Sequence, residues 1–277
     1  MRWDTLSESR MLDDLLERIH RHPDKCISVA YRNLDSGLEW FVQPDRVYHA
    51  ASTMKIGVMM EAFRQASEGR FALSDLWTLT NRFESIADGS PYSLNSSDDS
   101  DPELYLRVGE QVSVLELIER MIRKSGNLAT NEIISRVGAA RVQSFMDELG
   151  APDLVIRRGV EDYAAYAQGL NNTATARGLC EILSRLGREE VVSRTASLAM
   201  IEVLLGQEHN EGIPVGLMPG MRAAHKTGWI GEFYHDAGLV YSEADGLFVL
   251  VFLTEGFADM VAGGAFVAEA TNALLRD

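Results

Sequence analysis

Cysteine is scarce in this sequence, and its two copies, Cys26 and Cys180, lie far apart in the chain. Two isolated cysteines provide neither the ligand spacing of a metal site nor a disulfide framework. We therefore expect both thiols to behave as small, buried apolar side chains. The sequence also gives no reason to expect a metal ion or another cofactor.

Basic residues are in the minority. The 277 residues include 26 Lys and Arg against 41 Asp and Glu, which gives a net charge of -15. Phosphate groups repel such a surface, so the balance argues against nucleic acid and against an anionic membrane as partners. The expected partner is a small-molecule substrate, and the sequence leaves the oligomeric state open.

Long apolar runs are also missing. No stretch has the length of a transmembrane helix, and the first ten residues lack the apolar segment of a signal peptide. As written, the sequence predicts a cytoplasmic protein, and export is expected only if a leader has been removed. The chain is long enough to bury the core of one large or two small domains.

The order of periodic segments predicts an α+β fold. In chain order the patterns indicate a helix, a strand hairpin, a helical middle, three strands and a closing helix, at 6–22, 26–42, 52–205, 221–254 and 257–275. The economical assembly is one antiparallel sheet from both chain ends, flanked by the terminal helices. We expect a discontinuous α/β lobe (1–50 and 207–277), an all-helical lobe (51–206) and an active-site cleft between them.

The stretch from Ala50 to Met60 organises this interpretation. If it is helical, Ser52 and Lys55 lie one turn apart on the same face, so the hydroxyl and the amine can touch. Apolar neighbours would desolvate the amine and lower its pKa, which would let it accept the proton of Ser52. The unpaired N–H groups of the first turn would favour negative charge nearby. The alternative is a buried helix whose lysine extends to the surface.

Two further motifs follow, Ser-Gly-Asn at 125–127 between two helices and Lys-Thr-Gly at 226–228 within a strand. With Ser-x-x-Lys at 52–55, this ordered set resembles the class A β-lactamases and penicillin-binding proteins. The resemblance covers most of the chain, and the stretches 83–104, 125–134, 158–175 and 225–236 are similar to the β-lactamase-related serine hydrolases, a branch of this group. It implies the β-lactamase/DD-peptidase-like fold.

The resemblance also implies roles for the motif residues. Ser52 would be the acylated nucleophile and Lys55 its base. Ser125 would pass a proton to the leaving nitrogen, and Asn127 would bind the substrate amide. These residue types suit acyl transfer, which needs a hydroxyl beside a base and a proton donor for the leaving group.

The strand motif would contribute the remaining contacts. By the resemblance, Lys226 and Thr227 would hold a substrate carboxylate, and Gly228 would leave room for a ligand along the strand edge. The oxyanion hole would come from the backbone N–H groups of Ser52 and Trp229. The indole of Trp229 would narrow the pocket or stack on the substrate.

The pattern departs from the family where the acyl-enzyme is hydrolysed. Class A enzymes use a Glu in Glu-x-x-Leu-Asn, but here Ala167 stands three residues before Leu170. Glu161 and Asp162 lie slightly upstream, and one of them could activate water, although paired acids in a polar loop are more often solvated surface or loop braces. If neither acts, deacylation would be slow.

Three other positions are expected to be structural or simply different. Gly126 replaces the Asp of the Ser-Asp-Asn form and removes a side chain that could brace the two lobes. His225 and His235 flank the same strands and are expected to be structural.

Three functions remain open at this point. The first is a β-lactamase-related serine hydrolase that opens β-lactams or related amides and esters through Ser52. The second is a cytoplasmic esterase or amidase on the same fold, such as a glutaminase-like enzyme. The third is a binding module without activity, against which the retained Ser52, Lys55, Ser125 and Lys226 argue.

Overall fold

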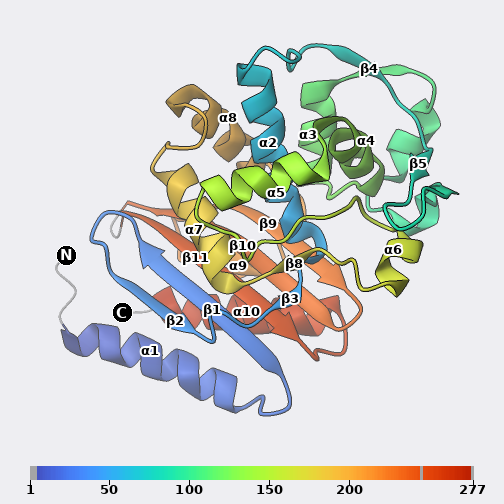
Figure 1. Cartoon of the computed structure of the whole chain (residues 1–277). Helices are drawn as coiled ribbons and strands as arrows, with labels where there is room; N and C mark the ends of the chain where they lie inside the picture. The colour runs from blue at the N-terminus through green and yellow to red at the C-terminus, as the bar shows by residue number, and fades with distance from the viewer. Residues whose placement is uncertain (1–4, 244–245, 276–277) are drawn as a thin grey trace.

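The computed structural model describes residues 5–243 and 246–275, and a five-stranded antiparallel sheet forms its centre (Figure 1). Its strands come from both ends of the chain, as expected. In spatial order they are β2 (Glu39–Val42), β1 (Cys26–Asn33), β11 (Gly246–Glu255), β10 (Phe233–Ser242) and β9 (Arg222–Ile230). The predicted hairpin and the three predicted C-terminal strands are confirmed, and β9 is an edge strand.

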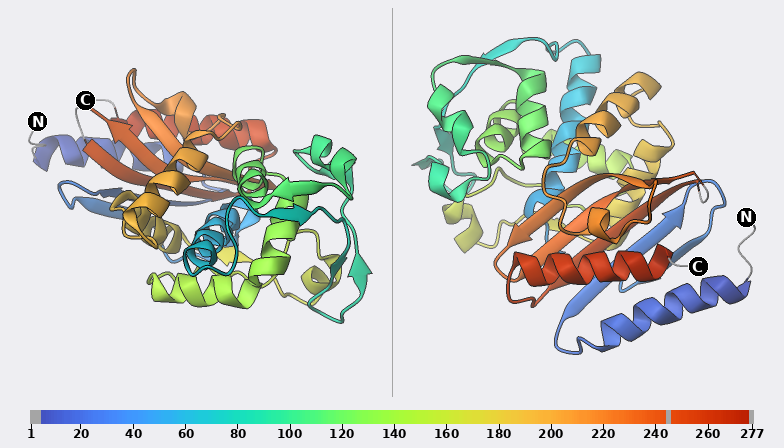
Figure 2. Two further views of the ribbon diagram at one scale, coloured as in Figure 1. Left: turned by 90° about the horizontal axis from the view of Figure 1, so that it is seen from above. Right: turned by 180° about the vertical axis from the view of Figure 1, so that it is seen from behind.

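Both faces of this sheet are buried. Successive side chains of a strand point to opposite faces, and Val29 and Tyr31 accordingly enter one hydrophobic cluster while Ala30 enters another. The first face is covered by α1 (Thr5–His20) and α10 (Met260–Leu275), which lie side by side (Figure 2). Burial on two sides explains why β11 is a nearly continuous apolar run rather than an alternating one.

The other face supports the helical region. It comprises α2 (Lys55–Ser67), α3 (Val114–Arg123), α4 (Asn127–Val137), α5 (Ala139–Glu148), α6 (Tyr163–Ala167), α7 (Ala176–Gly187) and α8 (Arg194–Leu205). Of these, α7 packs on β11 and β1, and α8 packs on β9. The predicted helical middle is confirmed, although its patterns did not indicate α6 or the short α9 (Ile213–Gly216).

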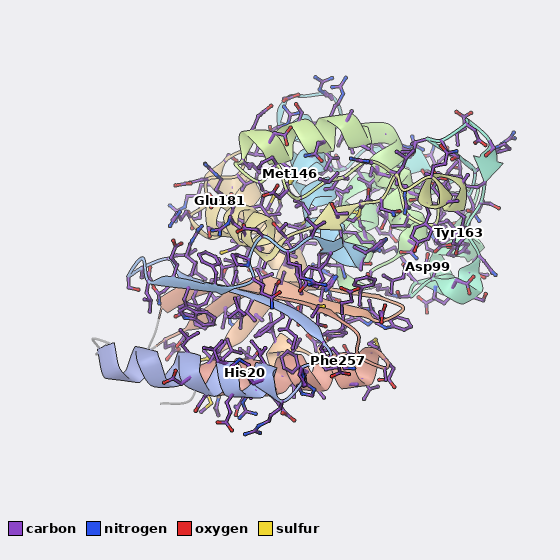
Figure 3. The ribbon with its side chains drawn as sticks, turned by 60° about the horizontal axis from the view of Figure 1, so that its bottom comes forward. His20, Asp99, Met146, Tyr163, Glu181 and Phe257 are labelled. Carbon is purple, nitrogen blue, oxygen red and sulfur yellow. The ribbon has the colours of Figure 1, made fainter. Side chains whose placement is uncertain are left out.

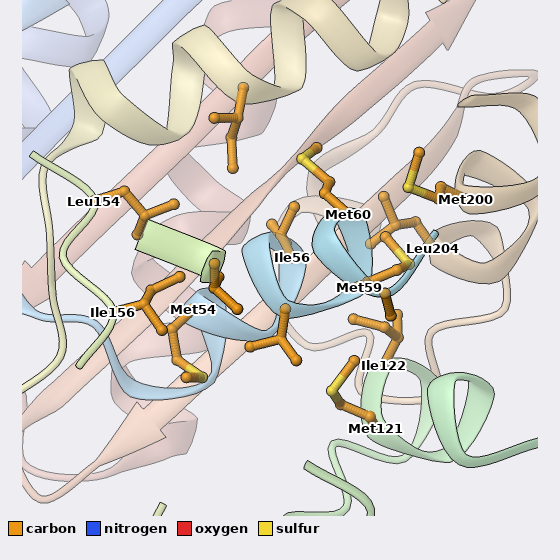
Figure 4. Close-up of a cluster of buried hydrophobic side chains, with 14 of the residues drawn as sticks. Met54, Ile56, Met59, Met60, Met121, Ile122, Leu154, Ile156, Met200 and Leu204 are labelled. Carbon is orange, nitrogen blue, oxygen red and sulfur yellow. The ribbon is translucent and has the colours of Figure 1, made fainter. Parts of the chain in front are cut away.

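Helix α2 runs through the middle of this region. Its side chains Ile56, Met59 and Met60 are fully buried, and they pack among residues of α3 and α8 such as Met121 and Met200 (Figure 4). A helix that is apolar on nearly every side is typical of such a central position. This burial holds α2 in place, including its first residue, Lys55, on which the functional interpretation depends.

Short strands and turns complete the fold. Three pairs form, β3 (Tyr48–His49) with β8 (Thr173–Ala174), β4 (Leu76–Thr78) with β7 (Gln111–Ser113), and β5 (Phe83–Glu84) with β6 (Pro91–Tyr92). Between β6 and β7 the chain contains only the 3-10 helices η2 (Ser96–Asp98) and η3 (Pro102–Arg107). The polar stretch 84–106 is therefore mostly irregular, as its composition indicates.

One hydrophobic cluster contains residues of the sheet, such as Val249 and Val251, together with the core of the helical region. The two proposed lobes thus pack directly on each other, and their boundaries at 50 and 206 stay a prediction. Among residues 5–243 and 246–275, each helix is too short or too polar to cross a bilayer. Cys180 is buried as expected, whereas Cys26 is only half-buried.

Candidate active site

Ser52 lies on the turn that leads into α2. The structure places it in a 3-10 helix, η1 (Ala51–Met54), and the α-helix begins only at Lys55. The prediction of one continuous α-helix from Ser52 is therefore wrong for the first turn. The preceding residue, Ala51, has φ +45°, a left-handed conformation that costs a residue with a Cβ about 1–2 kcal/mol. Ser52 is half-buried, and its side chain makes no hydrogen bond within the described parts of the chain. The expected contact between its hydroxyl and the Lys55 amine is therefore not formed in this structure.

Lys55 is fully buried beneath this turn. Its Nζ donates to the carbonyl oxygen of Ser125 over 2.7 Å and to Asn127 Oδ1 over 2.9 Å, and it lies 3.4 Å from Ser125 Oγ. Burial lowers the pKa of Lys55 to about 7, against the opposing charges of Asp99 and Glu161. An amine with such a pKa is substantially neutral at neutral pH, as a base must be.

The Ser-Gly-Asn turn is held by a loop that the sequence did not implicate. The Asp99 carboxylate accepts hydrogen bonds from the N–H groups of Asn127, at 2.9 and 3.0 Å, and of Leu128, at 2.9 Å. It thereby caps the start of α4. These bonds support a turn in which Ser125 adopts φ +58°, so part of the function of stretch 84–106 is to fix this turn.

A neighbouring acid lies beside Gly126. A Cβ on this glycine would stand 3.2 Å from the Cβ of Asp101. The Asp101 side chain is buried and forms two bonds with the Arg120 guanidinium, at 2.9 and 3.0 Å. The Asp101 carboxylate, held by Arg120, thus lies beside the position at which the central residue of the motif has no side chain, which the sequence alone did not indicate.

The edge strand β9 brings the third motif to the turn. A Cβ on Gly228 would lie 2.9 Å from the backbone nitrogen of Ser52 and 3.2 Å from that of Thr53. Glycine is thus required for the approach of β9 to η1, because backbone atoms cannot move aside as a flexible side chain can. The predicted reason for this glycine, room for a ligand along the strand edge, stays a prediction.

Lys226 is fully buried and donates to the carbonyl oxygen of Thr227 over 2.9 Å. Burial lowers its pKa well below the ordinary value, the charge of Lys55 lowers it further, and Asp236 opposes the shift. Burial thus disfavours the charged forms of both lysines. A ligand carboxylate placed beside them would stabilise their protonated forms.

The two histidines near this strand have structural partners. His225 Nδ1 lies 2.7 Å from Asp236 Oδ1, and its Nε2 lies 3.1 Å from Asn210 Oδ1. His235 Nε2 lies 2.8 Å from the carbonyl oxygen of His49. Both rings are buried in the protein, and neither lines the cavity described below.

Glu161 and Asp162, the adjacent acids of the loop 157–172, lie in different environments. Glu161 is half-buried and adopts φ +58°, and its Oε1 accepts a 2.7 Å hydrogen bond from Asn127 Nδ2. Burial raises its pKa, with Asp99 adding to the shift while the bond from Asn127 opposes it. Since Asn127 also binds Lys55, one amide joins the acid to the amine.

Asp162 is instead a brace. Its Oδ1 accepts hydrogen bonds from Ser85 Oγ, at 2.7 Å, and from the N–H of Ala165, at 3.0 Å, where it caps α6. Its Oδ2 accepts the N–H of Ile86 at 3.0 Å. Its carboxylate is occupied and 2% exposed, although Asp162 also contributes to the lining of the cavity described below, so these contacts favour a bracing role over the predicted activation of water.

A cavity of about 350 Å³ opens at Ser52. Ser52, Asn127 and Glu161 line it, whereas Lys55, Ser125 and Lys226 are buried and do not belong to its lining. Lys55 contacts the lining residue Asn127 over 2.9 Å. Four half-exposed or exposed apolar and aromatic side chains form its walls, two from α6 and two from the end of β9: Tyr163, Tyr166, Trp229 and Ile230. Figure 3 shows Tyr163 on the helical side of the molecule, in the same part as Asp99.

Sequence reasoning missed Arg158, which lines the same cavity. Its guanidinium donates to the carbonyl oxygens of Leu170 and Gly159, at 2.9 and 3.0 Å, and to Asn171 Oδ1 at 3.1 Å. These bonds close the loop on itself, together with those of Asn172 to the backbone of Arg158. No spacing motif identifies such contacts, because they form only when the loop folds back.

Comparison with known proteins agrees with this geometry. The sequence pattern described as the β-lactamase enzyme family matches residues 10–276. No curated protein matches the chain. The structure named PBP-A is similar at 27% identity and a TM-score of 0.80, over 95% of this chain and 93% of that one.

Two further structures are informative. A variant of PBP-A, described as an acyl-enzyme complex with penicillin G, is 26% identical with a TM-score of 0.80, over 96% of this chain and 94% of that one. An ancestral class A β-lactamase is 21% identical with a TM-score of 0.82, over 96% and 98% of the two chains, and shows the shared fold. The predicted resemblance and α+β fold are confirmed.

Proposed function

Because the chain belongs to the β-lactamase enzyme family and is therefore a serine β-lactamase-like hydrolase, we propose that Ser52 attacks a β-lactam or a related amide or ester. The observation that carries the proposal is the fully buried Lys55, whose pKa lies at about 7 and whose amine is held next to Ser125. Such an amine takes a proton from a serine far more readily than an ordinary lysine does.

The proposed reaction begins with Ser52 Oγ attacking the substrate carbonyl while its proton passes to Lys55. The N–H groups of Ser52 and Trp229 would stabilise the oxyanion, and the close approach of Gly228 to the Ser52 nitrogen supports this pairing. Ser125 would then donate a proton to the leaving nitrogen. Asn127 would bind the substrate amide, with Lys226 and Thr227 holding a carboxylate.

Glu161 is the proposed base for hydrolysis of the acyl-enzyme. It lines the cavity with Ser52, and its raised pKa makes its carboxylate a better proton acceptor than an exposed one. Glu161 is not part of a Glu-x-x-Leu-Asn sequence. We therefore expect hydrolysis of the acyl-enzyme to be slower than acylation of Ser52. Accumulation of the acyl-enzyme, the form in which the PBP-A variant is described, fits this expectation.

Substrate turnover tests the proposal against the esterase or amidase alternative. A chromogenic cephalosporin, a short acyl ester and glutamine are each incubated with the parent and with Ser52→Ala. We expect hydrolysis of the cephalosporin that is lost in the variant. Turnover of the ester or glutamine without any reaction of the cephalosporin would overturn the β-lactam assignment but keep the nucleophile. Equal activity in Ser52→Ala would overturn both.

A further inference from the structure

His49 lies three residues before Ser52 and lines the same cavity, although no motif includes it. It is the second residue of β3, where it pairs with Thr173 of β8. This pairing places the residue between the end of the loop 157–172 and the turn that carries the nucleophile. Its contacts show what it does there.

The imidazole of His49 binds the backbone next to Ser52. The N–H of Ala51 donates to His49 Nδ1 over 3.0 Å, and Ala51 is the residue whose φ of +45° is unfavourable. Because Nδ1 is the acceptor, the proton of the neutral ring is on Nε2. Burial and the nearby Arg158 lower the pKa of His49, which favours this neutral form.

A second histidine secures the backbone of His49. His235, fully buried in β10, places its Nε2 2.8 Å from the His49 carbonyl oxygen, and its Nδ1 lies 2.8 Å from the carbonyl oxygen of Tyr234 and 3.2 Å from the backbone nitrogen of Thr254. Burial lowers the pKa of His235 to about 4, so that this ring is neutral as well. His235 of the central sheet is thus linked through His49 to Ala51, the residue before Ser52.

We propose that His49 is a positioning residue for the nucleophile, and that its Nδ1 holds Ala51 in the conformation that presents Ser52 to the substrate. The ring takes no proton from Ser52, because Nδ1 is occupied and Nε2 already carries a proton. The inference rests on the proposed role of Ser52 as the nucleophile. It assigns the left-handed turn before Ser52 a specific support.

Two substitutions separate this role from simple packing. Asparagine can accept a hydrogen bond from the N–H two residues ahead, so His49→Asn keeps the acceptor and removes the imidazole. His49→Leu fills a similar volume without an acceptor. A misplaced nucleophile reacts roughly 10- to 100-fold more slowly, which is the loss that we expect for His49→Leu. His49→Asn is expected to remain within about threefold of the parent, well inside that loss.

The measurement is the rate at which a fluorophosphonate probe labels Ser52, with thermal melting as the check on folding. His20→Leu, an exposed histidine on α1 (Figure 3), is the matched control and should label like the parent. Equal impairment of His49→Asn and His49→Leu, or no impairment of His49→Leu, would overturn the proposal.

A second readout does not depend on activity. Hydrogen exchange of the Ala51 amide, measured by NMR, should be at least about tenfold faster in His49→Leu than in the parent and His49→Asn. If the probe fails to label the parent, the proposed nucleophile is wrong, yet this exchange still tests the hydrogen bond. Unchanged exchange in His49→Leu would contradict the positioning role itself.

Discussion

The two sides of the cavity are built in different ways. On one side, η1, the 125–127 turn and β9 are locked by buried contacts: Lys55 is fully buried, and Gly228 allows backbone to lie against backbone. On the other side, the loop 157–172 carries the half-buried Glu161 in a left-handed conformation and the exposed Tyr163. Under the proposed mechanism, acylation would depend on a preorganised framework, whereas hydrolysis of the acyl-enzyme would depend on one acid in a loop.

The largest effect is expected on the locked side. Lys55→Met keeps the size of the side chain but removes the base, so acylation of Ser52 should slow roughly 10²- to 10⁴-fold. The rate is measured from the mass of the protein after mixing with a β-lactam. A variant that is acylated as fast as the parent would show that Lys55 is only a buried packing residue.

A substitution on the loop side of the cavity should mainly affect the second step, hydrolysis of the acyl-enzyme. In Glu161→Gln the side chain can no longer take a proton from water, so hydrolysis of the acyl-enzyme should slow roughly 10²-fold or more while its formation changes far less. Pre-steady-state kinetics with a chromogenic cephalosporin separate the two rates. Equal slowing of acylation and of hydrolysis would contradict the proposal that the two sides of the cavity serve different steps.

Asp162→Ala is the matched control in the same loop. It leaves the Ser85 hydroxyl and the N–H groups of Ile86 and Ala165 without their acceptor, which should lower the free energy of unfolding by about 1–3 kcal/mol. Chemical denaturation measures this loss. A stability equal to that of the parent would contradict the assignment of Asp162 as a brace.

The pH dependence of acylation tests the state of Lys55. With its pKa at about 7, the amine is protonated at lower pH and cannot accept the proton of Ser52. The acylation rate should therefore fall about tenfold for each pH unit below 7 and level off above it. Continued increase of the rate to pH 9 would mean that Lys55 keeps an ordinary pKa.

The smallest effect is expected at the cavity wall. Trp229 is 52% exposed at the end of β9, so Trp229→Ala should leave the stability nearly unchanged and change KM about two- to tenfold, in the range of a lost apolar contact. Steady-state kinetics with substrates of different acyl groups measure the change. A large loss of kcat would instead assign the indole a role in the reaction.

The sequence predicted much of this architecture because the relevant patterns are local. Helix α2 and strands β9, β10 and β11 were recognisable from their periodicity, and the three motifs located Ser52 and its neighbours. The 3-10 turn before Lys55 was not recognisable, since it packs against β9 at Gly228, a contact between residues that lie far apart in the sequence.

The missed residues share a physical reason. Asp99, Arg158 and His49 act through bonds to backbone groups that only the folded loops bring within reach. A short polar segment contains many acids and hydroxyls, and nothing in their order shows which backbone groups they will meet. Glu161 and Asp162 illustrate this, because adjacent acids with similar sequence context take different partners.

Time-resolved mass spectrometry of the protein with penicillin G tests the central claim most directly. The account predicts that one β-lactam adduct forms on Ser52, located by peptide mapping, and then decays slowly as the acyl-enzyme hydrolyses. A folded protein that gains no adduct, or that gains it at another residue and equally in Ser52→Ala, would contradict the account.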